Sequence, residues 1–144
     1  MPYYFFDTSA LAKRYHYEVG SDKVDKILAD QKASFIIANI VIPEMTSAFV
    51  KKLNEGIITR KILDNTISEF SKDIITDFWI IDLERHHVMQ SKNLIIKHNL
   101  RALDGIHLSL LLSLKSLNPI LVCSDQRLVN AAIKKKIGFI NPEE

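Results

Sequence analysis

Five short runs of apolar residues lie along the chain, and longer stretches with helical spacing separate them. These runs predict β-strands at Tyr3–Phe6, Phe35–Ala38, Phe78–Leu83, Ile120–Cys123 and Ile137–Ile140. Most of the runs are continuously apolar rather than alternating. That pattern is typical of strands buried on both faces of a parallel sheet.

The stretches between the runs repeat apolar residues every third or fourth position, as amphipathic helices do. The stripes predict helices after Ser21, before Gly56, after Thr59, up to Asn99 and over residues 126–136. Residues 104–117 are apolar nearly all round, so we expect a buried helix there. Strands alternating with helices predict an α/β protein with three layers and a mostly parallel sheet. A chain of 144 residues suits a single domain, 1–144.

Composition narrows the class of protein only slightly. The chain is 47% hydrophobic and 25% charged, and its single cysteine, Cys123, excludes an internal disulfide. The first apolar run ends at Phe6, too short for a signal peptide or a membrane span, so we expect a cytoplasmic protein. A net charge of +2 does not by itself indicate nucleic-acid binding. We interpret the run Lys134–Lys136 as a solvated helix end in preference to an RNA-contacting patch.

Acidic residues stand where an open parallel sheet forms its binding sites, beyond the carboxyl ends of the strands. Asp7 follows the first predicted strand directly, and Asp125 follows the fourth by two residues. Asp104 stands at the start of the buried helix. Glu44 follows the second strand, and Pro43 at or near the first helical position would place it in a first turn.

Helix capping is a sufficient explanation of each Asp taken singly, because Asp is a favoured N-cap. Capping explains the four acids together less well. Thr8, Ser9 and Ser124 stand beside the Asp residues and would cap without charge, and Glu44 is not a preferred cap. Two carboxylates about 4 Å apart repel by roughly 4 kcal/mol at an effective dielectric near 20, so such a cluster favours a bound cation. Oxygen ligands without Cys or His suit Mg²⁺ or Mn²⁺, which fits hydrolysis of a phosphodiester bond.

Four blocks of sequence resemble those of the PIN-domain nucleases, and most closely the VapC-type toxins of toxin–antitoxin pairs. They are FFDTSALAKRY, IVIPEM, LRALDGIHLSLL and LVCSDQRLVNAAIKKKIGFINP, in the family's order and across nearly the whole chain. The resemblance implies a five-stranded parallel sheet between helices and an acidic groove that binds Mg²⁺ or Mn²⁺. It also implies endoribonuclease activity on RNA, inhibition by a cognate antitoxin, and a homodimer.

The resemblance also assigns roles by position. Four residues match the family's acidic quartet, whose members bind metal and take part in catalysis: Asp7, Glu44, Asp104 and Asp125. Asp7 and Asp104 are the firmest metal ligands, and Asp125 matches the acid that varies most. Ser9 matches a small polar position that orients Asp7 or a bound phosphate. Cys123 stands where Thr or Ser is common, so a supporting hydroxyl is missing. Gly105 replaces a common Ala, which we expect to loosen the start of its helix.

Several other residues invite a functional interpretation. Lys13, Arg14 and Arg127 follow the acidic positions along the chain, and either contact RNA phosphates or are ordinary surface charges. We expect His107 to pack beneath the site rather than to bind metal. The adjacent residues His86 and His87 are expected to point apart on a helix, and Trp79 is expected to lie in the core.

Two further functions remain open from the residues alone. One is phosphatase chemistry with Asp7 as the nucleophile, although Ser9 stands where the familiar phosphatases of this kind carry a second Asp. The other is a non-catalytic protein-binding or RNA-binding module whose acids only cap helices.

Overall fold

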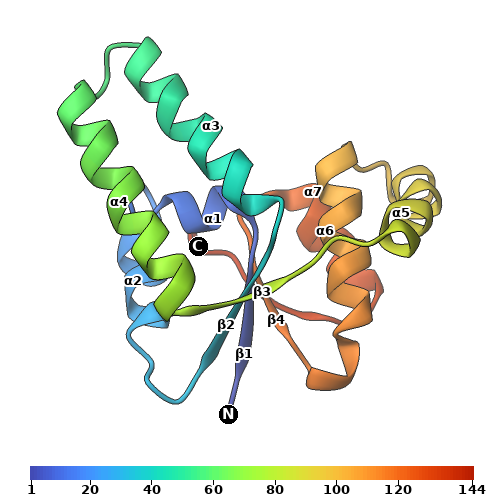
Figure 1. Ribbon diagram of the computed structural model, residues 1–144. Coiled ribbons are helices and arrows are strands. Elements are labelled where there is room, and N and C mark those ends of the chain that lie inside the picture. The colour runs from blue at the N-terminus through green and yellow to red at the C-terminus, as the bar shows by residue number, and fades with distance from the viewer.

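Figure 1 shows the computed structural model, which describes all residues from 1 to 144. Its five strands are β1 (Tyr3–Phe6), β2 (Ser34–Ala38), β3 (Phe78–Ile81), β4 (Ile120–Val122) and β5 (Gly138–Ile140). They form one sheet in the order β3-β2-β1-β4-β5, and every pairing is parallel. The predicted α/β fold with a parallel sheet is therefore confirmed.

Two strands end earlier than predicted. β3 stops at Ile81 rather than Leu83 because the Leu83 N–H donates to the side-chain oxygen of Asn39 instead of to a neighbouring strand. β4 stops at Val122, and Cys123 lies just beyond it, although its N–H still reaches the Ile140 carbonyl at 3.1 Å. Both chain segments leave the sheet at its carboxyl edge, and at Leu83 a polar side chain replaces the backbone hydrogen bonds between strands.

Seven α-helices and one 3₁₀ turn connect the strands. The helices are α1 (Thr8–Ala12), α2 (Ser21–Leu28), α3 (Val41–Asn54), α4 (Arg60–Thr76), α5 (Arg85–His98), α6 (Ala102–Ser113) and α7 (Gln126–Lys134). The predicted buried helix corresponds to α6, but it ends at Ser113, and Lys115–Leu117 form the 3₁₀ turn η1. Asn118 then adopts the left-handed conformation that turns the chain into β4.

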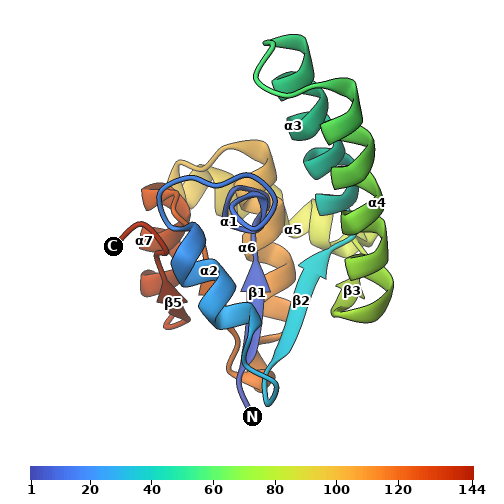
Figure 2. The same ribbon diagram turned by 90° about the vertical axis from the view of Figure 1, so that its left-hand side faces the viewer.

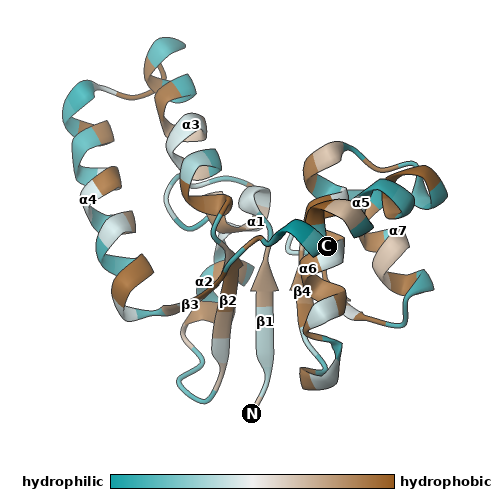
Figure 3. Ribbon diagram, turned by 45° about the vertical axis from the view of Figure 1, so that its right-hand side comes forward, coloured by the Kyte–Doolittle hydropathy of each residue, from teal (hydrophilic) through white to brown (hydrophobic).

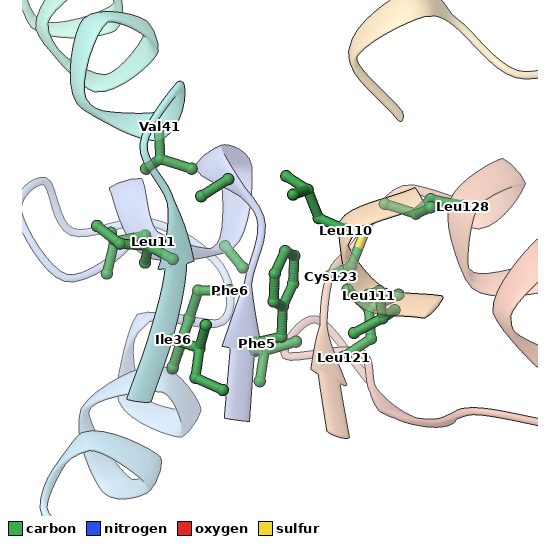
Figure 4. Packing of buried hydrophobic residues seen from close by; sticks show 14 of the residues in the cluster. Phe5, Phe6, Leu11, Ile36, Val41, Leu110, Leu111, Leu121, Cys123 and Leu128 are labelled. Carbon is green, nitrogen blue, oxygen red and sulfur yellow. The ribbon is translucent and has the colours of Figure 1, made fainter. Parts of the chain in front are cut away.

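The core lies on both faces of β1. Phe5 and Phe6 are fully buried, and because successive residues of a strand point to opposite faces, each belongs to a different side of the sheet. Phe5 packs edge-on against His107 of α6, whereas Phe6 packs against Phe35 and Phe78. Figure 4 shows this central packing around β1. Burial on both faces explains the continuous apolar run at the start of the chain.

The expectation that Trp79 lies in the core is wrong. Its side chain belongs to β3, which is an edge strand, and 49% of its surface is exposed. Side chains on an edge strand lose the cover that a neighbouring strand and the helices give to central positions.

The expected loosening at Gly105 is also wrong. Gly105 is buried within α6, and a Cβ atom built there would lie 2.9 Å from Cδ1 of Ile95 in α5 and closer still to Cγ1. The glycine therefore allows α5 and α6 to approach each other closely, and the absence of a side chain fixes this helix pair.

The helices α3 and α4 form an antiparallel hairpin that projects beyond the carboxyl edge of the sheet (Figures 1 and 2). The base of α3 stands beside α1, while α5, α6 and α7 gather on the other side of β1 (Figure 1). The two groups of helices thus flank the end of β1. None of the helices is long and apolar enough to cross a membrane.

Candidate functional site

A pocket of about 580 Å³ opens at the carboxyl edge of the sheet. The four acids singled out by the sequence all line it, each from a different segment: Asp7 after β1, Glu44 in α3, Asp104 in α6 and Asp125 before α7. The remaining lining residues are Thr8, Ser9, Ala12, Ala48, Arg101, Ala102, Leu103 and His107. The fold thus brings together carboxylates that lie up to 118 positions apart in the chain.

Asp7 is held tightly at the floor of the pocket, with only 5% of its surface exposed. Its Oδ1 accepts a hydrogen bond from the Ala10 N–H at 2.9 Å, which caps α1. The Ser9 hydroxyl lies 3.1 and 3.0 Å from the two oxygens. Burial raises the pKa of the Asp7 carboxyl, and its hydrogen bonds and the nearby His107 only partly offset this. Ser9 therefore lies where the prediction put it, in contact with Asp7.

Cys123 links Asp7 to Asp125. Its thiol lies 3.1 Å from Asp7 Oδ2, and its sulfur accepts from the Asp125 N–H at 3.2 Å. Burial and the neighbouring Asp7 charge raise the pKa of the Cys123 thiol far above its ordinary value, so the group stays protonated and donates. The hydroxyl that the resemblance implies is absent, and a thiol donor occupies its place.

Asp104 is not a helix cap. It lies inside the first turn of α6, and Arg101 occupies the N-cap position without a side-chain capping bond. Burial, and after it the charges of Asp125 and Asp7, raise the pKa of Asp104 from 3.8 to about 6. The carboxylates of Asp7, Asp104 and Asp125 therefore repel one another electrostatically. Helix capping does not explain this repulsion.

Glu44 reaches the pocket from the first turn of α3, as the sequence predicted, although the helix begins at Val41 and Pro43 is its third residue. The Thr8 hydroxyl donates to Glu44 Oε1 at 2.9 Å, and His107 Nε2 lies 3.6 Å from the same oxygen. His107 is 2% exposed and packs beneath the site as expected, while its Nδ1 has no hydrogen-bond partner. The hydrogen bond from Thr8 thus orients Glu44, and His107 lies next to the same oxygen.

Asp125 has a capping role. Its Oδ1 accepts from the N–H groups of Arg127 and Leu128 at 2.9 and 3.4 Å, so it closes the N-terminus of α7. Capping therefore applies to Asp7 and Asp125, but it does not account for Asp104 or Glu44.

The three cations proposed from the sequence do not line the pocket. Lys13 is buried, with its ammonium 2.9 Å from Glu18 and 3.6 Å from Glu143. Arg14 pairs with Asp73 at 3.3 Å, and Arg127 is exposed outside the lining. The cation that does line the pocket is Arg101, which sequence reasoning missed. Its place three residues before Asp104, at the start of α6, is the signal that would have found it.

The expectation that His86 and His87 point apart is wrong. Their rings lie 3.9 Å apart, and together with Glu84 they form a group whose potential ligand atoms all lie within 4.8 Å. However, His87 Nδ1 accepts from the Glu84 N–H at 3.1 Å, closing the N-terminus of α5 in a capping box. This bond occupies one nitrogen and leaves the proton of the neutral ring on the other, so the group is explained by capping.

No protein-family model and no curated protein sequence matches the chain. Solved structures do match over almost the entire length. A toxin–antitoxin complex from Klebsiella pneumoniae contains a chain 16% identical, with a TM-score of 0.66 and 98% of each chain covered. VapBC2 from Rickettsia felis, bound to a promoter DNA fragment, gives 15% identity, a TM-score of 0.63 and coverage of 96% of this chain and 98% of that one.

FitAcB from Neisseria gonorrhoeae gives 15% identity, a TM-score of 0.66 and 96% coverage of both chains. Identities this low establish similarity of fold. The chain therefore has a PIN-like α/β fold, similar to that of a chain in a toxin–antitoxin complex.

Proposed function

We propose that the chain is a metal-dependent endoribonuclease that hydrolyses RNA phosphodiester bonds as the toxin of a VapC-type toxin–antitoxin pair. The observation that carries the proposal is the convergence of four carboxylates in one pocket, where the pKa of Asp104 is raised to about 6 partly by two of the others. Unpaired carboxylates gathered in this way favour a divalent cation.

The donor set suits Mg²⁺ or Mn²⁺, because all four acidic residues of the pocket offer carboxylate oxygens. No three of the pocket acids bring ligand atoms within 4.8 Å of one another. Mg²⁺ tolerates such spacing, since it keeps several waters and binds directly through only one or two carboxylates. Asp7 and Asp104 would hold the ion, with Glu44 and Asp125 contacting its water shell.

The bound ion would supply a polarised water and neutralise charge on the phosphate. The chain's own residues orient the carboxylates. Ser9 and Cys123 donate to Asp7, and Thr8 donates to Glu44, so these bonds fix the orientation of both carboxylates. Arg101 at the rim is placed to bind a phosphate next to the scissile bond.

The alternatives fit the site less well. A phosphatase with Asp7 as nucleophile needs a free carboxylate, but both Asp7 oxygens accept hydrogen bonds and burial raises the pKa of the group. A module whose acids only cap helices explains Asp7 and Asp125. Asp104 and Glu44 cap no helix: they lie in first helical turns, where acids are favoured, but that preference does not require them to share a pocket with the other two.

The fold also supports proposals about partners. Because matched structures are toxin–antitoxin complexes covered over nearly their full length, we infer that a cognate antitoxin binds and inhibits this chain. A homodimer and a cytoplasmic location complete the proposal, as the family resemblance implies.

The decisive experiment compares RNA cleavage by the unaltered chain and by Asp104→Asn in Mg²⁺, in Mn²⁺ and in excess EDTA. Cleavage should need metal and should fall by at least 100-fold in the variant. Asp64→Asn is the control, because this acid is exposed on α4 outside the pocket. Equal cleavage by a folded Asp104→Asn protein would overturn the assignment, as would a lack of any Mn²⁺-dependent rise in melting temperature. A ligand at 100 times its Kd adds about 2.7 kcal/mol to stability.

A further inference from the structure

The lysine run 134–136 becomes part of a larger basic cluster in the folded chain. Lys97 at the end of α5 and Lys115 in η1 both interact electrostatically with Lys135, which follows α7. The charge of Lys97, and less strongly that of Lys115, lowers the pKa of the Lys135 ammonium. We call Lys97, Lys115, Lys134, Lys135 and Lys136 the lysine patch.

Two members of the patch border a surface hollow of about 220 Å³. Lys115 and Lys136 line this hollow, and none of its lining residues is acidic; the others are Asn118, Pro119, Ile120, Ile137 and Gly138. Burial, and after it the charges of Lys135, Lys97 and Lys134, lower the pKa of His98, which keeps the imidazole neutral at pH 7. Figure 3 shows the end of α7 and the turn after it as a hydrophilic segment.

None of the five lysines forms an ion pair, whereas other cations of the chain, such as Lys13 and Arg14, are paired with acids. Grouping unpaired ammonium groups has an electrostatic cost, which a polyanion with several regularly spaced charges would relieve. Lysine ammonium groups bind phosphates as point charges on flexible stems.

The position of the patch relative to the pocket indicates what kind of polyanion it binds. The pocket holds four acids and one cation, so it repels the phosphates of a nucleic acid. Favourable binding free energy for such a substrate has to come from another surface. Helix α6 starts at the pocket and leads to η1, and a helix of 12 residues is about 18 Å long. A structured RNA spans this distance, whereas a short fragment bound in the pocket does not.

We propose that the lysine patch binds the phosphate backbone of a structured RNA whose cleaved strand enters the acidic pocket. The inference rests on the proposed ribonuclease function. It adds that substrate affinity and selection for longer, folded RNA come from a surface remote from the acids.

The test measures binding of a long hairpin RNA in EDTA, where cleavage is blocked, as a function of salt concentration. The variant combines three exposed or partly exposed positions of the patch, Lys97→Gln, Lys134→Gln and Lys135→Gln. The control removes the same charge from exposed lysines elsewhere, Lys26→Gln, Lys61→Gln and Lys72→Gln. We expect the patch variant to bind at least 10-fold more weakly and to lose about 2 from the slope of log K against log salt, since each phosphate contact contributes roughly 0.7–0.9. The control should change binding less than about 2-fold by comparison.

Two results would overturn the inference: an equal loss of affinity in both variants, or unchanged affinity in the patch variant. Displacement of the RNA by polyglutamate at equal charge concentration would also overturn it, because the surface would then favour an acidic protein.

Cleavage assays separate this inference from the proposed function. With Mn²⁺ added, the patch variant should cleave a short oligonucleotide as well as the unaltered chain does, but should show a raised KM for the hairpin. If neither RNA is cleaved while hairpin binding still depends on the patch, the ribonuclease proposal fails and the lysine patch stands. If both RNAs are cleaved equally well by both proteins, the ribonuclease proposal stands and the patch inference fails.

Discussion

Replacing Asp104 with Asn should stabilise the metal-free protein at neutral pH. Asp104 is the acid whose pKa the pocket raises to about 6, through burial and through the charges of Asp125 and Asp7. In the unfolded chain the same group has its ordinary pKa near 3.8, so ionisation above pH 6 opposes folding. Asn keeps the size and the polarity of the side chain but carries no charge.

The magnitude follows from the difference between the two pKa values. A difference of about 2 corresponds to about 3 kcal/mol, and partial exposure of the carboxyl reduces this to about 1–2 kcal/mol through solvent screening. Well below pH 3.8 Asp104 is protonated in both states and imposes no cost. As pH rises from about 4 to 6, the folded state of the unaltered chain loses this free energy, and above pH 6 the deficit is constant.

Urea denaturation in EDTA at pH 4, 5, 6 and 8 measures the effect. The variant should gain about 1–2 kcal/mol at pH 8, or about 3–6 °C in melting temperature, and at pH 4 the gain should fall to a small fraction of this. Added Mn²⁺ should reverse the order, because only the unaltered chain then has its full set of ligands. A variant that is less stable at pH 8, or a gain that does not depend on pH, would refute repulsion between the pocket acids as the cause.

Three further predictions concern groups around the site and the core. Gly105→Ala should destabilise the fold by about 1–3 kcal/mol in urea denaturation, because the new methyl group meets Ile95, and adding Ile95→Ala should reduce the cost of the glycine substitution. Asp73→Ala should cost about 2–3 kcal/mol, since this buried carboxylate accepts hydrogen bonds at 2.7 and 3.3 Å; the exposed Asp64→Ala should cost less than about 0.5 kcal/mol. Cys123→Ala removes a hydrogen-bond donor to the Asp7 carboxylate, so half-maximal Mn²⁺ binding should move to higher pH, whereas Cys123→Ser should behave like the unaltered chain.

Several features of the fold were predictable because they depend on local sequence. Continuous apolar runs identified all five strands to within a few residues, and the fully buried Phe5 and Phe6 show why those runs do not alternate. Turn and capping residues marked the helix ends. The exposure of Trp79 was not predictable in this way, because an apolar residue in a strand does not show whether its strand lies at the edge of the sheet.

The site was predictable in part for the same reason. Asp7 directly follows a strand and Asp125 comes shortly after another, so their place at the carboxyl edge of a parallel sheet follows from the chain direction. The cations were not predictable in this way. Lys13 and Arg14 lie close to Asp7 in sequence, yet the short helix α1 turns them towards acids elsewhere, at Glu18 and Asp73.

The sequence by itself determined the alternation of strands and helices, the parallel sheet and the edge at which the acids would lie, because periodicity and chain direction are local properties. Only the tertiary structure decided which charges became neighbours. It brought Arg101 rather than Lys13 to the four acids, and it added Lys97 and Lys115 to a run of three lysines. Electrostatic free energy depends on distance through space, and residues far apart in a chain acquire that distance only when the helices pack.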